Sequence, residues 1–231
     1  MTLRQWTDDT MAEVLGREHR TDPVLPGNGG PAGNARLTAW TGLVLLVLFA
    51  VELATLLDLG PLTDWHVVVG VLLVPPALLK TATTGWRIIR YYTGNRAYRS
   101  AGPPPMLLRV LGPLVVLTTL AVLGTGLALV AVGPDAGRAP WFYVGGRLAV
   151  TVLVLHKATF VLWAVATGVH TLARLVSAVR QISSGRAVPG RVVRVAVLVL
   201  TGLVAIAAAV VVLRLSGAWI NLPLPLHHRH G

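Results

Sequence analysis

The sequence predicts an all-α fold, a polytopic membrane helix bundle with five transmembrane helices. Hydrophobic residues make up 54% of the 231 residues and charged residues only 13%, a balance too apolar for an ordinary soluble domain. About 20 mostly apolar residues cross a hydrocarbon core of roughly 30 Å, and five stretches meet this requirement. They lie near residues 37–57, 66–89, 107–132, 147–173 and 192–214.

The rest of the chain divides around these spans. Residues 1–35 are expected to form a cytoplasmic flexible tail, because their Gly/Pro-rich end, PVLPGNGGPAGNAR, is polar and irregular. This stretch is too long and too mixed in charge to resemble the n-region of a signal peptide, so the first apolar stretch is expected to be a true span. Residues 36–215 are predicted to form the membrane domain, and residues 216–231 an extracytoplasmic tail.

The charges of the connections predict the orientation, because arginine and lysine near span ends stay on the cytoplasmic side. The connections after the second and fourth spans are rich in arginine, whereas DLGPLTDW after the first span has Asp58 and Asp64 and no base. We therefore expect a multi-pass protein of the cell membrane, in contact with lipid, with its N-terminus in the cytoplasm and its C-terminus outside. The net charge of +11 belongs largely to this inner rim, so nucleic-acid binding, which needs a basic face on a soluble domain, is not expected.

The fourth span carries two histidines, His156 and His170, which a lipid-facing helix should exclude. Ionisable residues inside spans are costly, and by default they mark a cofactor, an ion path or a proton relay. A separation of fourteen residues corresponds to about 21 Å of rise and just under four turns, so both imidazoles share one helix face. The alternative is that each histidine only forms hydrogen bonds with a neighbouring helix.

The second span adds His66 near its outer end and Lys80 deeper in the same helix. Because the second and fourth spans run in the same direction, His66 and His156 are predicted to meet in the outer half of the bundle. A haem iron needs two axial ligands on opposite faces, and imidazoles from facing helices supply them. His66 starts its span whereas His156 lies several residues into its own, so tilt or an unwound segment around Gly145 and Gly146 is needed.

The chain has no cysteine, which excludes disulfides, thiolate zinc sites and iron–sulfur ligation by this chain. Any metal is therefore expected to be held by histidine, carboxylate, lysine or methionine. Nothing in the sequence resembles a nucleophile–base pair, a phosphate-binding loop or a paired-carboxylate site. A dehydrogenase activity would require another subunit.

These features resemble the membrane cytochrome b subunits of bacterial hydrogenases and formate dehydrogenases, and the related bacterial cytochrome b561 proteins. The resemblance covers residues 37–175 and rests on His66, His156 and His170; TGWRIIRYYTGNRAYRSAGPPP also resembles the inner loop of actinobacterial cytochrome b-like proteins. It implies a four-helix haem-binding core with two stacked haems b, the outer one held by His66 and His156. It also implies electron transfer between an extracytoplasmic or membrane-associated redox subunit and the quinone pool or another carrier.

The first span departs from the family pattern because it contains no histidine for the inner haem. Lys80 is the predicted substitute, since it lies fourteen residues after His66, as His170 lies fourteen after His156. His19 in the tail is a second candidate. The third alternative is a single haem, with His170 forming part of a quinone site.

Several other residues are expected to contact the cofactor. Gly70 would let a macrocycle lie close to the backbone, and Trp163 is an aromatic neighbour on the histidine face. Glu52, the only carboxylate well inside a span, is expected to accept a proton or to pair with a buried lysine. Four arginines are expected to pair with haem propionates: Arg87, Arg90, Arg147 and Arg174.

Two classes of function remain open from the sequence. In the first, the protein is a haem b electron-transfer subunit with one or two haems. In the second, it is a haem-free transporter or assembly factor whose intramembrane histidine and lysine relay protons or bind a substrate. A helix kinked at Pro75 and Pro76 would suit the second class, whereas the arrangement of the histidines favours the first.

Overall fold

The computed structural model describes residues 7–8, 11–12, 22–100, 102 and 106–215. The predicted C-terminal tail, residues 216–231, and His19 lie outside the described residues. Long runs of leucine, valine and alanine form helices here, because a helix satisfies its own backbone groups where no water is available. The main elements are α2 (Gly30–Thr55), η1 (Leu56–Asp58), α3 (Leu59–Tyr92), α4 (Arg96–Arg99), α5 (Met106–Arg138), β1 (Phe142–Val144), β2 (Leu148–Val150), α6 (Val152–Ser183) and α7 (Arg191–Leu215).

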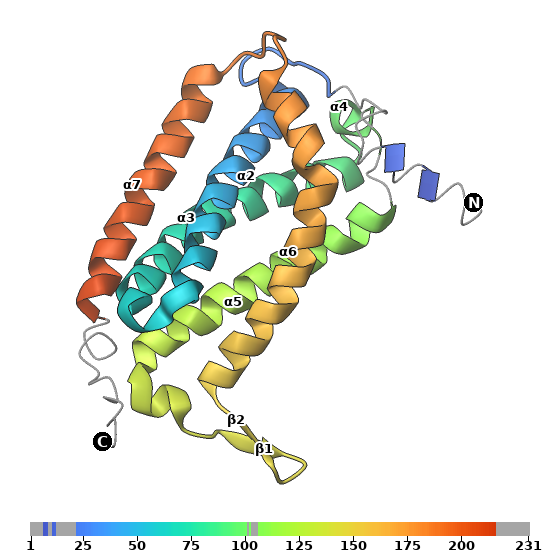
Figure 1. The fold of residues 1–231 in the computed structure, drawn as a ribbon. Helices are drawn as coiled ribbons and strands as arrows, with labels where there is room; N and C mark the ends of the chain where they lie inside the picture. The colour runs from blue at the N-terminus through green and yellow to red at the C-terminus, as the bar shows by residue number, and fades with distance from the viewer. Residues whose placement is uncertain (1–6, 9–10, 13–21, 101, 103–105, 216–231) are drawn as a thin grey trace, which may run out of the picture.

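Four of the long helices form a closed ring (Figure 1). Helix α2 packs against α3 and α6, and α5 packs against the same two helices. Helix α7 lies outside this ring and packs mainly on α3. The fold is therefore a four-helix bundle with one peripheral helix.

Within the described residues, four helical stretches are long and apolar enough to cross a membrane. The chain is thus a polytopic helical membrane protein. The first stretch comprises α2, η1 and α3 together, and the other three contain α5, α6 and α7. They run over Gly30–Tyr92, Arg109–Arg138, Val152–Ser183 and Arg191–Arg214.

The first helix begins earlier than the sequence predicted, at Gly30 instead of residue 37. Pro31 occupies its first turn, where a missing N–H costs nothing. The segment before it is tied to the rest of the protein: Asp22 accepts two hydrogen bonds from Arg87, and the carbonyl of Asn28 accepts one from Arg194. The end of the predicted flexible tail is therefore a fixed part of the fold.

Helix α3, which corresponds to the second predicted span, also begins earlier than predicted, at Leu59 instead of residue 66. It continues through Pro75 and Pro76 to Tyr92. A three-residue 3-10 turn, η1, is the only break between α2 and α3. Because of this early start, His66 lies seven residues inside its helix and not at the helix end.

Helix α6 starts later than predicted, at Val152 and not at residue 147. The preceding residues form an antiparallel hairpin of β1 and β2, which turns at Gly145 and Gly146. Three residues, Gly145, Gly146 and Arg147, connect the paired Val144 and Leu148, and the N–H of Arg147 donates to the carbonyl of Val144 at 3.3 Å. Both glycines have positive φ, 59° and 69°, as the two central residues of a type I′ turn require. His156 therefore lies four residues into its helix, and the expected mismatch in depth with His66 is reduced.

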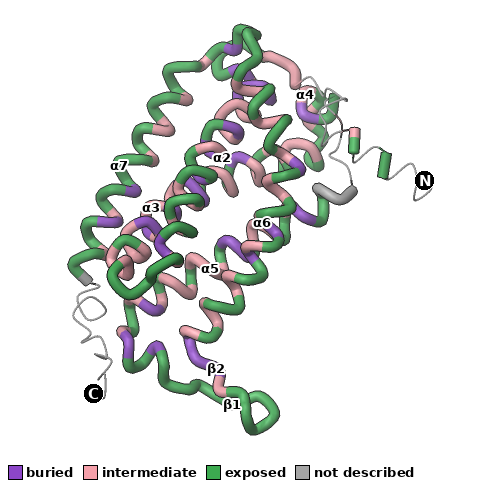
Figure 2. Tube along the Cα trace, in the orientation of Figure 1, coloured by how far each residue is buried: buried purple, intermediate pink, exposed green. Residues whose placement is uncertain are grey.

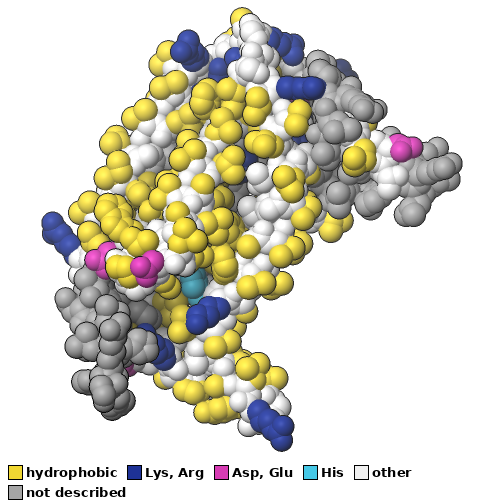
Figure 3. Space-filling view, in the orientation of Figure 1, with side chains coloured by type: hydrophobic (Ala, Val, Ile, Leu, Met, Phe, Trp, Pro, Cys, Tyr) yellow, Lys and Arg dark blue, Asp and Glu magenta, His cyan; other side chains and the backbone are white. Residues whose placement is uncertain are grey.

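Buried residues follow the sides of the helices that face one another, and much of the remaining surface is exposed and apolar (Figures 2 and 3). One buried cluster joins α2 and α3 through Leu45, Leu73 and Ala77. A second joins α5 and α6 through Leu111, Ala166 and Ala173.

Candidate functional site

His66 on α3 faces two residues at the end of α2. Its Nδ1 lies 3.0 Å from Oε1 of Glu52 and 3.0 Å from Oγ1 of Thr55. Thr55 donates its own hydroxyl hydrogen to the carbonyl of Glu52 at 2.6 Å, so its oxygen accepts from the imidazole. In the tautomer with the hydrogen on Nδ1, the imidazole donates to both oxygens and Nε2 keeps the lone pair that a metal ion needs.

His156 on α6 is held in the same way by a threonine of α5. Its Nδ1 lies 3.1 Å from Oγ1 of Thr125, which donates its hydrogen to the carbonyl of Ala121 at 2.8 Å. When the hydroxyl hydrogen points to this carbonyl, the threonine oxygen accepts from Nδ1–H, and Nε2 of His156 keeps its lone pair. The ring lies so close to the α5 backbone at Gly126 that a Cβ added there would be 3.2 Å from Cε1 of His156.

The structure brings the two histidine rings together, as predicted. Their centroids are 6.3 Å apart and their planes are inclined by 77°. With metal–nitrogen distances of about 2 Å, two imidazoles on one metal ion have ring centres about 6 Å apart. The part of the chain that the structure describes has no group of three or more His, Cys, Asp or Glu that could hold a metal. The described residues therefore offer two imidazole donors at this place.

Three aromatic side chains pack together about two turns further along α6 from His156. Trp163 is 5% exposed and donates a hydrogen bond from Nε1 to Oγ1 of Thr119 at 3.1 Å. Its ring centroid is 4.7 Å from that of Phe49 and 6.0 Å from that of Phe160. The predicted aromatic neighbour is therefore a packed element of the bundle centre.

The second predicted group lies toward the other end of the bundle. Lys80 and Arg174 are both within electrostatic range of His170. The Lys80 ammonium donates a long hydrogen bond, 3.4 Å, to the carbonyl of Thr38. Among the described residues, Nδ1 of His170 and Oγ1 of Thr167 are buried without a hydrogen-bond partner. These groups are free to bind a ligand.

The arginines that were expected to meet haem propionates have different surroundings in the structure. Arg87 forms a two-pronged ion pair with Asp22, at 3.0 and 2.6 Å, so its fork is already engaged. Arg90 lies over the Trp86 ring, 5.1 Å from its centroid. Arg147 is exposed in the β1–β2 connection.

Gly70 lies beside Glu52. A Cβ at this position would lie 3.3 Å from Oε1 of Glu52, so the glycine makes room for a carboxylate. The sequence reading did not find the roles of Glu52, Thr55 and Thr125 as histidine partners. One signal was present, since Glu52 and Thr55 are three residues apart and so share a helix face.

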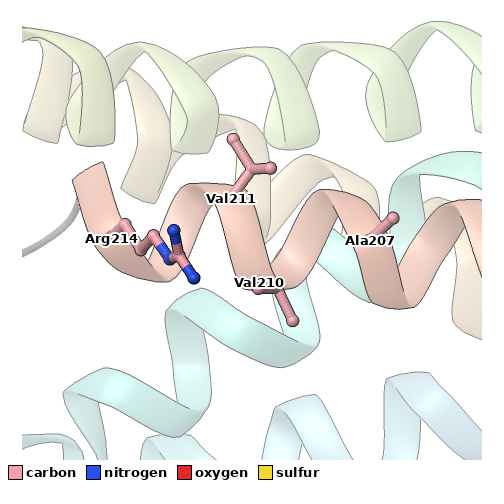
Figure 4. A pocket seen from close by; sticks show the side chains of 4 residues that line it. All are labelled: Ala207, Val210, Val211 and Arg214. Atoms are coloured by element: carbon pink, nitrogen blue, oxygen red, sulfur yellow. The ribbon is translucent and has the colours of Figure 1, made fainter.

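The pocket drawn in Figure 4 contains none of the predicted site residues. Its walls come from one face of α7: Ala207, Val210, Val211 and Arg214. No family model, curated protein or solved structure matches the chain.

Proposed function

We propose that this chain is a haem b electron-transfer subunit of the cell membrane, with five spans. Helices α2 and α3 count as two of them, because they pack against each other across η1. The 63 residues of that stretch would extend about 95 Å as one straight helix, three times the thickness of a hydrocarbon core. A hairpin of two spans suits this length.

The distribution of charge supports a cytoplasmic N-terminus and an extracytoplasmic C-terminus. Arginines cluster in the connections after α3 and after α6 together with the helix ends beside them, whereas the α2–α3 turn has Asp58 and no base. The arginines are Arg87, Arg90, Arg96, Arg99 and Arg109 around the first connection, and Arg174, Arg180, Arg186, Arg191 and Arg194 around the second. Since arginine stays on the cytoplasmic side, the β1–β2 hairpin and η1 then face outward.

The observation that carries the proposal is that His66 and His156 have similar partners at Nδ1 and lie close together. Each ring has its Nδ1 within 3.1 Å of a threonine hydroxyl of the helix packed against it, and the ring centroids are 6.3 Å apart. A bound haem would supply reversible one-electron chemistry, and the protein supplies ligation, burial and orientation. We propose a subunit that transfers electrons for a redox partner.

The depth of the two sites supports a route across the membrane. His66 and His156 lie within two turns of the helix ends that we assign to the outer face, near an extracytoplasmic redox partner. His170 and Lys80 lie deeper, toward the arginine-rich end. We propose that His170 holds a second haem with Lys80 opposite, or else forms a quinone site beneath a single haem.

An absorption spectrum of the purified full-length protein tests this function. We expect b-type α and Soret bands on reduction, and loss of the outer-haem bands in His66→Ala and in His156→Ala. His228→Ala, in the tail outside the described residues, is the control and should keep the full spectrum. Full haem content in both ligand variants would contradict the assignment.

One observation favours the second candidate, a haem-free transporter or assembly factor. Oε2 of Glu52 is buried without a hydrogen-bond partner in the described part of the chain, as are Oγ1 of Thr167 and Nδ1 of His170. Such polar atoms suit a path for protons or a substrate. If the protein purified from cells supplied with haem shows no haem bands, this candidate replaces the first.

A further inference from the structure

The hairpin of β1 and β2 exposes an unusual number of apolar and aromatic side chains. Five of them are each more than half exposed: Trp141, Phe142, Tyr143, Val144 and Leu148. An isolated two-stranded hairpin is only marginally stable in water. Exposure of these apolar side chains to water is unfavourable, so we expect the hairpin to lie in a less polar environment.

The register shows that both faces of the hairpin are apolar. Phe142 pairs with Val150 and Val144 with Leu148, and these four side chains share one face because alternate residues of a strand point the same way. The other face carries Tyr143, which pairs with Ala149. A protein partner would cover one face of such a ribbon, whereas the boundary layer of a membrane surrounds both.

The position of the hairpin favours the membrane. It joins α5 to α6 at the point where both apolar helices end, and it projects beyond the ring (Figure 1). Figure 3 shows hydrophobic side chains on the hairpin and over the neighbouring helices. The surface that faces lipid therefore continues onto the hairpin.

We infer that the β1–β2 hairpin lies in the interfacial layer of the lipid bilayer and anchors the start of α6. Tryptophan and tyrosine are enriched at this depth because their rings are apolar and their N–H or O–H groups reach water. Trp141 and Tyr143 supply those rings, and Phe142 and Val144 supply the side that faces the acyl chains. Arg147, next to the glycine turn, is set to meet lipid phosphate.

The position of the hairpin influences the position of His156 through the residues between them. Val150 and Val152 are buried against the bundle, so the hairpin and the first turn of α6 are joined through packed residues. His156 follows one turn later. A hairpin held at the lipid boundary fixes the depth at which this histidine enters the bundle.

Because the chain has no cysteine, single cysteines can carry a spin label without a background. We would label Tyr143→Cys and, as a second hairpin position, Leu148→Cys, in nanodiscs of phosphatidylcholine and phosphatidylglycerol. Two controls bracket them: Gly185→Cys in the exposed α6–α7 connection for water, and Leu203→Cys on the exposed face of α7 for lipid. The measurement is the accessibility of the label to oxygen and to a water-soluble nickel chelate.

We expect both hairpin labels to give an oxygen-to-nickel ratio between those of the two controls. A ratio equal to that of Gly185→Cys would show a hairpin in water and overturn the inference. Low accessibility to both reagents would show a protein contact, with a partner or a second copy, and would also overturn it. Haem content does not enter the measurement, so this inference and the proposed function succeed or fail separately.

Discussion

Oε1 of Glu52 lies 3.0 Å from Nδ1 of His66, although the two residues belong to different helices. The turn η1 folds α3 back on α2 and so brings them together. A carboxylate that accepts from a ligating histidine fixes its tautomer and raises its basicity, and loss of such a partner commonly weakens metal affinity about 10- to 100-fold.

Replacing Glu52 should therefore change the outer haem without removing its ligand. In Glu52→Gln, we expect the haem to remain bound and its midpoint potential to rise, because an amide oxygen is a weaker acceptor for Nδ1–H and leaves the imidazole a weaker electron donor. In Glu52→Leu, we expect haem affinity to fall about 10- to 100-fold. Redox titration and haem titration measure these effects. A potential and an affinity equal to those of the unmodified protein would show that Glu52 has no such role.

Thr125→Val should weaken the second ligand in a comparable way. It removes the acceptor for Nδ1 of His156 and nearly preserves the shape of the side chain, so we expect about 10-fold weaker haem binding. Thr118→Val is the matched control, because Thr118 is another α5 threonine whose hydroxyl bonds to its own helix backbone, and it is buried. Equal haem affinity in the two variants would contradict the proposed role of Thr125.

Gly126→Ala should displace the His156 ring. Its new Cβ would lie 3.2 Å from Cε1 of the imidazole, tighter than ordinary contact, so the ring must shift. The control Gly124→Ala meets nothing within 4 Å and should stabilise the helix by about 0.5–1 kcal/mol. We expect less haem per chain only in Gly126→Ala, measured by pyridine haemochrome; equal loss in both variants would point to a general packing effect.

The number of haems decides between the two proposals for the inner site. Two haems per chain, with one lost in His170→Ala and in Lys80→Ala, would support ligation by the histidine and the lysine. One haem per chain, unchanged in both variants, would leave His170 to the quinone proposal. If two haems are present and Lys80→Ala keeps both spectra, lysine is excluded and His19 or an external ligand must be tested.

Much of the bundle could be predicted from the sequence, because long apolar runs and a fourteen-residue histidine spacing are local signals. The start of α6 could not be predicted in this way. Residues 147–151 are mostly apolar and read as part of a span, but consecutive positive φ angles at Gly145 and Gly146 form a hairpin instead.

The hydrogen-bond partners of the histidines could not be predicted from the sequence either. The contact of His66 with Glu52 depends on the length of η1, and that of His156 with Thr125 depends on how α5 packs on α6. The pairing of Arg87 with Asp22 joins residues that are 65 positions apart. Each contact follows from the register between helices, which a hydropathy pattern does not encode.

The way in which the helices pair has a consequence for how the outer site is assembled during synthesis. His66 and its two acceptors, Glu52 and Thr55, belong to the α2–α3 hairpin, whereas His156 and Thr125 belong to the α5–α6 hairpin. Each half can set the tautomer of its own histidine before the other half exists. Helix α2 also packs against α6, so the ring closes only when the second hairpin has entered the membrane. Under the proposed function, capture of a haem between His66 and His156 would therefore be a late event that joins two prepared halves.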